Sequence, residues 1–369
     1  MSLASSFSSS AASKKNSSIE RLLIVRLSAM GDIIHSLPAA TTLRQFFPNA
    51  SIGWVVEERW AELLCTLSTS RSGPRSPQRP LADRIHVING ARWRSTPFST
   101  QTWEEIRAKL GELKKEHYQV VVDFQGAARS ALIARWSGAP VIYGTAQPRE
   151  NVASMFYTRQ VITQGAHVVE QNMSLAEAIT HQRLAAPHVE LPYDPVVEQE
   201  CEKRLQERGV RDFIILNPGA GWGAKQWPAE RYGQVAKELA RDGLKSLINF
   251  GPSEQKLVRV VEHASGGAAQ GLACSVTQLI ALTRRARLFI GGDTGPLHLA
   301  AALRIPVVAI FGPTNPARNG PYGTSSVVLR SSSSTTSHKR RMEPEAGLLQ
   351  ISPEEVVAAA RRLLKANHE

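Results

Sequence analysis

Several features that define common classes of protein are absent from this sequence of 369 residues. No apolar run approaches the ~18 residues that a membrane-spanning helix needs. The three cysteines, Cys65, Cys201 and Cys274, are odd in number and far apart, so they match neither a zinc site nor a disulfide framework. Such sparse cysteines favour a reducing compartment, and we therefore expect the protein in the cytoplasm.

The motifs of several enzyme classes are also missing. No Gly-x-Gly-x-x-Gly follows the first expected strand, which argues against a dinucleotide-dependent oxidoreductase. The sequence contains neither a P-loop nor a Gly-x-Ser-x-Gly elbow, so we expect neither a P-loop phosphotransferase nor an α/β-hydrolase. None of the seven aspartates forms an Asp-x-Asp pair. A glycosyltransferase built around a metal-binding pair of that kind is therefore not indicated.

The chain is strongly basic, with a formal net charge of +12 at pH 7. About half of this excess lies in three low-complexity segments, at residues 1–18, 69–81 and 331–346. The remainder favours anionic partners such as phosphates or an acidic membrane surface. We do not expect nucleic acid as a partner, because clustered aromatics and a DNA- or RNA-reading motif are both lacking. The Ser- and Ala-rich segment 1–18 has no signal-peptide order, and we predict a disordered tail there.

Apolar runs of strand length alternate with amphipathic helices along the chain, and this alternation predicts parallel sheets covered by helices on both faces. The pattern occurs twice. It predicts an N-terminal α/β domain at 19–185, a C-terminal α/β domain at 195–350, and a final helix within 351–369. Two doubly wound sheets joined by a short linker face each other across a cleft at the carboxyl ends of their strands, where such sheets bind ligands.

The individual elements follow from the same pattern. The strands expected in the first domain are 21–27, 51–56, 84–88, 119–123 and 140–143, and those in the second are 213–216, 246–250, 288–290 and 307–311. The expected helices are 31–47, 103–116, 127–136 and 353–366, with four more beginning near 229, 254, 276 and 296. Two Ser- and Arg-rich stretches, 69–80 and 331–345, are expected to be flexible insertions.

Asp32 stands in the motif Ser28-Ala-Met-Gly-Asp-Ile-Ile-His-Ser-Leu-Pro-Ala39, where the first strand gives way to a helix. An acid at this position is often only a helix-capping residue, and that interpretation alone would account for it. His35 follows one helical turn later on the same face. A single histidine there is more often a polar partner at a helix start than a catalyst.

A second strand–turn–helix motif is Ile290-Gly-Gly-Asp-Thr-Gly-Pro-Leu-His-Leu-Ala-Ala-Ala-Leu303. Its turn brings Asp293, Thr294 and the free amides around Gly295 to the open end of a sheet. Helix N-termini carry unpaired N–H groups and partial positive charge, so this corner suits a phosphate-bearing ligand. A site for a phosphate group alone would need neither Asp293 nor His298, and their presence indicates a nucleotide-sugar site.

These two motifs, together with Phe311-Gly-Pro-Thr-Asn-Pro316, resemble those of the bacterial ADP-heptose:lipopolysaccharide heptosyltransferases, glycosyltransferase family 9. The similarity is greatest to the heptosyltransferase I branch and runs from about residue 21 to 323, resuming at 351–356. The resemblance implies an α/β GT-B fold with two Rossmann-like domains, the acceptor on the N-terminal side and the nucleotide-sugar on the C-terminal side. It also implies inverting transfer without a cofactor or an obligatory metal.

The resemblance assigns roles to particular residues. It makes Asp32 the general base, with His35 beside it, and it makes Lys225, in a glycine-rich loop before Trp-Pro, a contact of the donor diphosphate. An ordinary surface lysine remains an alternative for Lys225. Glu254 is equally well interpreted as a ribose ligand or as a first-turn helix acid. The donor-binding residues predicted in this way are Glu254, Asp293, Thr294, Gly295, Pro296 and His298.

The acceptor implied by the resemblance is the acidic Kdo region of a lipid A precursor at the cytoplasmic surface of the inner membrane. Four arginines are candidate anchors for its carboxylates and phosphates: Arg26, Arg92, Arg94 and Arg129. Solvated surface arginines are an alternative for each. Two other functions stay open at this point: a related GT-B transferase with another nucleotide-sugar or glycolipid, and a nucleotide-sugar-binding protein without turnover.

Overall fold

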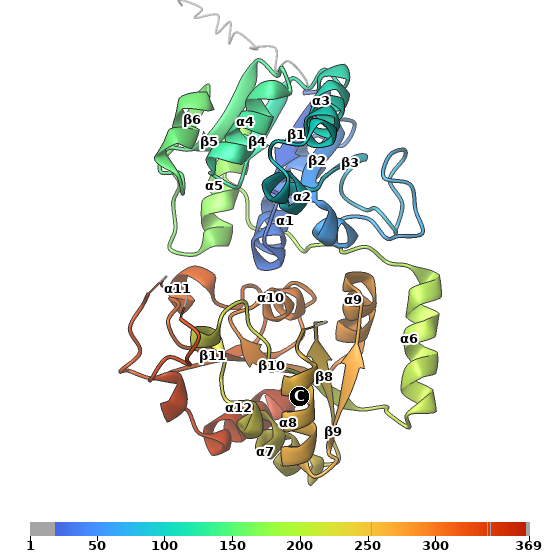
Figure 1. The fold of residues 1–369 in the computed structure, drawn as a ribbon, viewed down its shortest axis with the longest axis vertical. Helices are drawn as coiled ribbons and strands as arrows, with labels where there is room; N and C mark the ends of the chain where they lie inside the picture. Colours follow the sequence, from blue (N-terminus) through green and yellow to red (C-terminus); the bar gives the residue numbers. More distant parts are fainter. Residues whose placement is uncertain (1–18, 252, 338, 340, 367–369) are drawn as a thin grey trace, which may run out of the picture.

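The computed structural model describes residues 19–251, 253–337, 339 and 341–366, and the predicted tail at 1–18 lies outside them. Two lobes lie one above the other, the upper built from the first half of the chain and the lower from the second (Figure 1). Each lobe contains one sheet of six strands. The architecture is therefore the predicted pair of α/β domains.

All strand pairs in the first sheet are parallel, and their order is β3-β2-β1-β4-β5-β6. Strand β1 lies inside the sheet, and four of its five residues are apolar and fully inaccessible to solvent. The elements of this half are β1 (Arg21–Val25), α1 (Met30–Phe46), β2 (Ser51–Glu57), η1 (Glu58–Leu63), β3 (Arg84–Ile88), α2 (Gly90–Ser95), α3 (Thr100–Lys115), β4 (Val120–Asp123), α4 (Ala128–Trp136), β5 (Val141–Thr145), η2 (Asn151–Phe156), β6 (Arg159–Val161) and α5 (Val168–Thr180).

The second sheet is also parallel throughout, in the order β12-β11-β10-β7-β8-β9. Counted from its own first strand, this order is the same as that of the first sheet. The elements of this half are α6 (Pro195–Glu207), β7 (Phe213–Asn217), η3 (Gly223–Lys225), α7 (Ala229–Ala240), β8 (Lys245–Phe250), α8 (Gln255–Ser265), β9 (Ala269–Ala273), α9 (Val276–Arg285), β10 (Leu288–Gly292), α10 (Gly295–Ala302), β11 (Val307–Phe311), α11 (Pro316–Asn319), β12 (Ser326–Arg330), η4 (Leu348–Gln350) and α12 (Pro353–Ala366).

The strand order creates one switch point in each sheet. Chain connections diverge to opposite sides between β1 and β4 in the first sheet and between β7 and β10 in the second. In open parallel sheets the crevice at the carboxyl ends of such strands is where ligands bind. The two sequence motifs lie there, since α1 follows β1 and α10 follows β10.

The two domains are in direct contact. The hydrophobic core of the first domain continues into Leu279, Ile280 and Leu299 of the second. Glu62 accepts hydrogen bonds from the backbone and the hydroxyl of Thr277, at 2.9 and 2.8 Å. Helices α1 and α10 meet at the junction of the lobes (Figure 1). The final helix α12 packs on the second sheet.

Among the described residues, seven α-helices and strands were not expected from the sequence. Three are the edge strands β6, β9 and β12, and four are the helices α2, α5, α6 and α11. The segment 69–80 also differs from the flexible insertion that we expected. It folds around the buried Arg79, whose guanidinium donates to the carbonyls of Gly73 and Pro74 at 2.5 and 2.7 Å. Within the described residues, no helix combines the length and the apolar character needed to cross a bilayer.

Candidate active site between the two domains

Asp32 lies in the first turn of α1, at the switch point of the N-terminal sheet. One carboxylate oxygen accepts a hydrogen bond from the amide of Ala29 at 3.2 Å, as a capping acid would. The other pairs with Arg26 at 3.1 Å, and 44% of the Asp32 side chain stays exposed. Arg26 is buried and also donates to the carbonyl of Phe124. Asp32 thus caps its helix and still presents an accessible carboxylate.

Lys225, Asp293 and His298 form a compact ionic cluster at the switch point of the C-terminal sheet. The Lys225 ammonium lies 2.7 Å from one oxygen of Asp293, and the Nε2 atom of His298 lies 3.1 Å from the other. Burial alone would raise the pKa of Asp293, but its hydrogen bond to His298 and the charges of His298 and Lys225 hold that pKa well below the ordinary range. Asp293 is therefore an ionised carboxylate at neutral pH.

His35 of α1 reaches across the domain boundary to this cluster. Its Nε2 atom lies 3.1 Å from the Nδ1 atom of His298, and both rings are buried. Burial lowers the pKa of His35 well below its usual value, and the nearby His298 and His167 lower it further. Burial likewise lowers the pKa of His167. His35 is therefore neutral at physiological pH.

The starts of α1 and α10 are packed directly against each other. A Cβ added to Gly31 would lie 2.5 Å from the His298 ring, and one added to Gly295 would lie 2.6 Å from Met30. Both distances are too short for a real side chain, so only glycine fits at these positions. Asp32 directly follows Gly31, and the carboxylate-bearing turn of one domain therefore adjoins the turn of the other that holds Asp293.

The remaining predicted donor residues surround the ends of β7, β8 and β10. Thr294 precedes α10, and among the described residues its hydroxyl makes no capping bond. Pro296 occupies the first turn of α10 and has no N–H. Asn217 donates to the Thr294 hydroxyl at 3.4 Å and to the Gly219 carbonyl at 3.1 Å. Glu254 directly precedes α8 without a side-chain capping bond, and its carboxylate accepts a 2.7 Å hydrogen bond from the Gly251 amide.

The four predicted acceptor arginines do not gather at one point. Arg94 and Arg129 converge on the buried Glu57, at 3.9 and 2.9 Å, and Arg59 joins them at 3.3 Å. Arg92 pairs instead with Glu105 at 4.0 Å. Arg26 lies beneath Asp32, as described above. The structure therefore brings together two of the four and adds Arg59, which the sequence did not single out.

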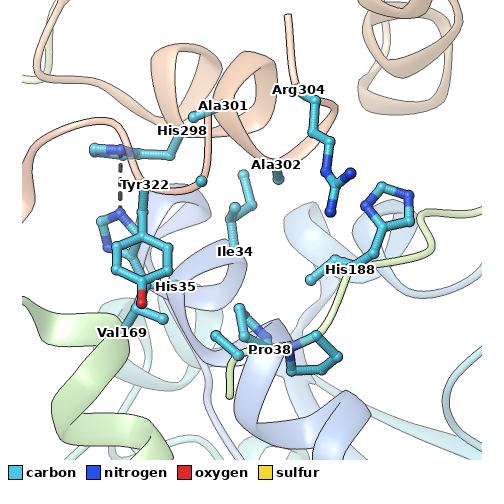
Figure 2. Close-up of a pocket in the computed structure, with 14 residues that line it drawn as sticks. Ile34, His35, Pro38, Val169, His188, His298, Ala301, Ala302, Arg304 and Tyr322 are labelled. Atoms are coloured by element: carbon cyan, nitrogen blue, oxygen red, sulfur yellow. Dashed lines mark hydrogen bonds between the residues drawn. The ribbon is translucent and has the colours of Figure 1, made fainter. Parts of the chain in front are cut away.

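An interdomain pocket with a cavity volume of about 90 Å³ lies beside the His35–His298 pair. Figure 2 shows the two rings hydrogen-bonded at its wall, with Ile34 and Pro38 of α1 facing Ala301 and Ala302 of α10. Tyr322 and Val169 close the same side, while Arg304 and His188 lie at the opposite rim (Figure 2). The buried histidine pair therefore forms part of the wall of this pocket.

Several contacts of the predicted residues had no signal in the sequence. His167 lies edge-on to His35, with ring centroids 5.4 Å apart, and stacks on Tyr322 at 4.9 Å. Asn172 donates to the His35 carbonyl at 3.0 Å. These partners are distant in the sequence and belong to helices or loops without a motif. Only Glu57, which ends a strand at the ligand-binding edge, was open to prediction.

Because buried histidines stay neutral, we predict that the free energy of unfolding depends on pH. The folded chain binds fewer protons than the unfolded one below about pH 6.5, where a free histidine becomes charged. Stability is therefore fully present above this pH and is lost as the pH falls, by up to about 1.4 kcal/mol per buried histidine at about pH 5.5. Thermal unfolding at about pH 7.5 and 5.5 measures this loss. His35→Gln is expected to reduce the difference, and an unchanged difference would contradict the prediction.

Comparisons with known proteins bear on the fold and on the family of the chain. The model of glycosyltransferase family 9 (heptosyltransferase) matches residues 106–349. Lipopolysaccharide heptosyltransferase 1 of Pseudomonas aeruginosa is 30% identical over 328 residues, covering 84% of each chain. The structure of Escherichia coli heptosyltransferase WaaC with ADP has a TM-score of 0.73 at 26% identity, covering 93% of this chain and 99% of that one.

A second structure of WaaC, with ADP-2-deoxy-2-fluoro heptose, has a TM-score of 0.71 at 26% identity and covers 94% of this chain and 99% of that one. The GT-B fold expected from the motifs is confirmed by these structures and by the paired parallel sheets. The assignment to the transferase family is confirmed as well. The chain belongs to glycosyltransferase family 9, the heptosyltransferases.

Proposed function

We propose that this enzyme transfers heptose from ADP-L-glycero-D-manno-heptose to the Kdo of a lipopolysaccharide inner-core precursor, with inversion at the anomeric carbon. One observation carries the proposal: the turn that bears Asp32 packs against the start of α10, where Asp293 and Lys225 form an ion pair. A base on one domain and a diphosphate site on the other are what a single displacement between two substrates requires. The relatives support the donor, since WaaC structures carry ADP and a fluorinated ADP-heptose.

Asp32 acts as the general base in this proposal. The acceptor hydroxyl attacks the anomeric carbon, its proton passes to the Asp32 carboxylate, and the carbon–oxygen bond to ADP breaks with its electron pair leaving on the diphosphate. The exposed fraction of Asp32, 44%, supports this role because the carboxylate is accessible. Arg26 keeps the carboxylate oriented through the 3.1 Å ion pair.

Lys225 and the start of α10 hold the donor diphosphate. Negative charge develops on the leaving diphosphate, and an ammonium with helix N-terminal amides stabilises it. The Lys225 ammonium forms an ion pair with Asp293 at 2.7 Å. Donor binding then brings the diphosphate to Lys225 and leaves Asp293 for a sugar hydroxyl. Glu254 lies at the neighbouring strand end and binds the ribose.

The arginine cluster Arg59, Arg94 and Arg129 binds the acidic acceptor. Three guanidinium groups share one buried carboxylate, Glu57, so two positive charges remain for an anion. Carboxylates and phosphates of a Kdo-bearing lipid A precursor suit this surplus because arginine binds them through paired hydrogen bonds. An acceptor of this kind is a lipid, and we propose that the enzyme works at the cytoplasmic surface of the inner membrane.

Transfer itself is tested with ADP-heptose and Kdo-lipid A, by mass spectrometry of the lipid product. We expect a product larger by one heptose, and competition by ADP but not by UDP or GDP. A clear preference for UDP or GDP would identify another nucleotide-sugar as the donor. Tight ADP-heptose binding without release of ADP would show a binding protein instead of a transferase.

The acceptor proposal makes a separate prediction. Arg94→Ala and Arg129→Ala are each expected to raise the KM for Kdo-lipid A about tenfold, because each removes a charged hydrogen bond to the acceptor. The donor KM is expected to change less than about twofold, which steady-state kinetics with each substrate varied in turn measures. Arg135→Ala, an exposed position of the same helix as Arg129, is the control. An equal rise for all three variants would indicate a non-specific charge effect.

A further inference from the structure

A continuous hydrogen-bonded path runs from the acceptor-side helix α1 into the donor cluster. His298 uses both ring nitrogens in this path: Nδ1 lies 3.1 Å from His35 and Nε2 lies 3.1 Å from Asp293. The second oxygen of Asp293 lies 2.7 Å from Lys225. Among the described residues, this path therefore joins four side chains, and His35 is the only one of the four that belongs to the N-terminal domain.

The protons in this path are restricted by its geometry. Ionised Asp293 only accepts hydrogen bonds, so the Nε2 atom of His298 carries a hydrogen and donates it. The two facing nitrogens of His298 and His35 then share one proton, because a hydrogen bond needs one donor and one acceptor. Without His35, a buried ring nitrogen of His298 has no partner, and its orientation toward Asp293 is no longer fixed.

His35 is itself held in place from several sides. Asn172 of α5 donates to its carbonyl at 3.0 Å. The ring of His167 lies edge-on to it, and that ring is fixed by a 3.0 Å bond to the Gly320 carbonyl of the second domain. The charged groups that face His35 are Asp293 and Arg26, and the titratable ones are His298 and His167. The backbone and the ring of His35 are thus each held by a neighbour, as a positioning role requires.

We propose that His35 is a positioning residue that completes the donor site of the opposite domain, so that ADP-heptose binds tightly only when α1 is docked against α10. The inference rests on the proposed function, since it takes Lys225 and Asp293 as donor ligands. Its consequence is that the acceptor-side domain contributes to donor affinity without touching the nucleotide. Domain docking and donor binding are then thermodynamically coupled, so that each favours the other.

The test compares two variants that differ by one methylene. His35→Gln places an amide nitrogen and oxygen near the position of Nε2, and can either donate to or accept from His298. His35→Asn is equally polar but too short to reach that nitrogen. We expect His35→Asn to raise both the Kd for ADP, measured by calorimetry, and the donor KM about tenfold, with the acceptor KM unchanged. His35→Gln is expected to stay within about threefold of the natural protein.

Two controls separate positioning from general damage. Ser36→Ala removes a buried hydroxyl that bonds only the Ile33 carbonyl of its own helix, and is expected to leave ADP binding unchanged. A double-mutant cycle of His35→Asn with His298→Ala is expected to be strongly non-additive, because the second change removes the ring nitrogen on which the first acts. Thermal unfolding of each variant shows whether the fold is kept.

The inference is overturned if His35→Asn binds ADP as the natural protein does, or if His35→Gln loses as much affinity as His35→Asn. Additive effects in the cycle would overturn it too. Failure of the proposed function looks different, because the natural protein itself would then fail to transfer heptose from ADP-heptose, whether or not it binds ADP. If neither variant folds, His298→Gln decides between the outcomes. Its amide overlaps Nε2 and keeps the contact with Asp293 but lacks the nitrogen that faces His35, so the inference expects a Kd for ADP raised about tenfold, and unchanged binding would overturn it.

Discussion

Asp32→Asn is expected to reduce kcat about 10³-fold and to leave the Kd for ADP within about twofold. The amide keeps the size of the side chain but cannot take the proton of the acceptor hydroxyl. Donor binding is preserved because the diphosphate contacts of the proposed site belong to Lys225 and α10. Single-turnover kinetics, which measure the chemical step apart from product release, and calorimetry with ADP check the two halves of the prediction.

Glu58→Gln is the matched control for this experiment. Glu58 is an exposed acid that follows β2 at the same edge of the sheet, with 57% of its side chain accessible. Removal of its charge is expected to change kcat less than about twofold. If Asp32→Asn kept most of its turnover, Asp32 would be only a helix cap, and another base would have to be found. A loss of ADP affinity together with kcat would point to a displaced α1.

Lys225→Met is expected to lower kcat/KM for ADP-heptose about 10²–10³-fold. Methionine keeps the length of the side chain and its packing on the Trp222 ring, where the ammonium now lies 5.0 Å from the centroid. It removes the cation that faces the diphosphate and leaves Asp293 as a buried anion without its 2.7 Å partner. The remaining carboxylate then repels the donor, so both binding and the chemical step suffer.

The effect of Lys225→Met is measured by donor-dependent kinetics and by calorimetry with ADP. Lys237→Met, on the exposed face of α7, controls for the loss of a positive charge from the same domain. Unchanged ADP affinity in Lys225→Met would show that the ion pair with Asp293 is structural, and that the diphosphate lies elsewhere. A drop in the acceptor KM alone would likewise contradict the assignment.

The strands of the sheet centres could be predicted because they carry continuous apolar runs. Four strands of this kind are buried on both faces and consist mostly of apolar residues: β1, β7, β10 and β11. The edge strands lack that signal: β6 has three residues, all at least partly exposed, and β9 includes Gly271 and two exposed positions. Their pairing is decided by the sheet that they join and not by their own composition.

The same distinction applies to the site. Each switch-point motif was visible locally, because a strand, a turn and a helix start follow one another within a few residues. The contact that joins the motifs was not visible. His35 and His298 are 263 residues apart, and their hydrogen bond depends on how two separately folded domains dock. The gathering of Arg59, Arg94 and Arg129 on Glu57 depends in the same way on three different elements meeting at one sheet edge.

The most direct test of the account is a crystal structure with a fluorinated ADP-heptose analogue and Kdo-lipid A bound together. The account predicts an Asp32 carboxylate oxygen within about 3 Å of the acceptor hydroxyl, on the face of the anomeric carbon opposite the diphosphate. It also predicts the diphosphate at Lys225 and the start of α10. An Asp32 carboxylate with no acceptor hydroxyl within reach, while both ligands are bound, would contradict it.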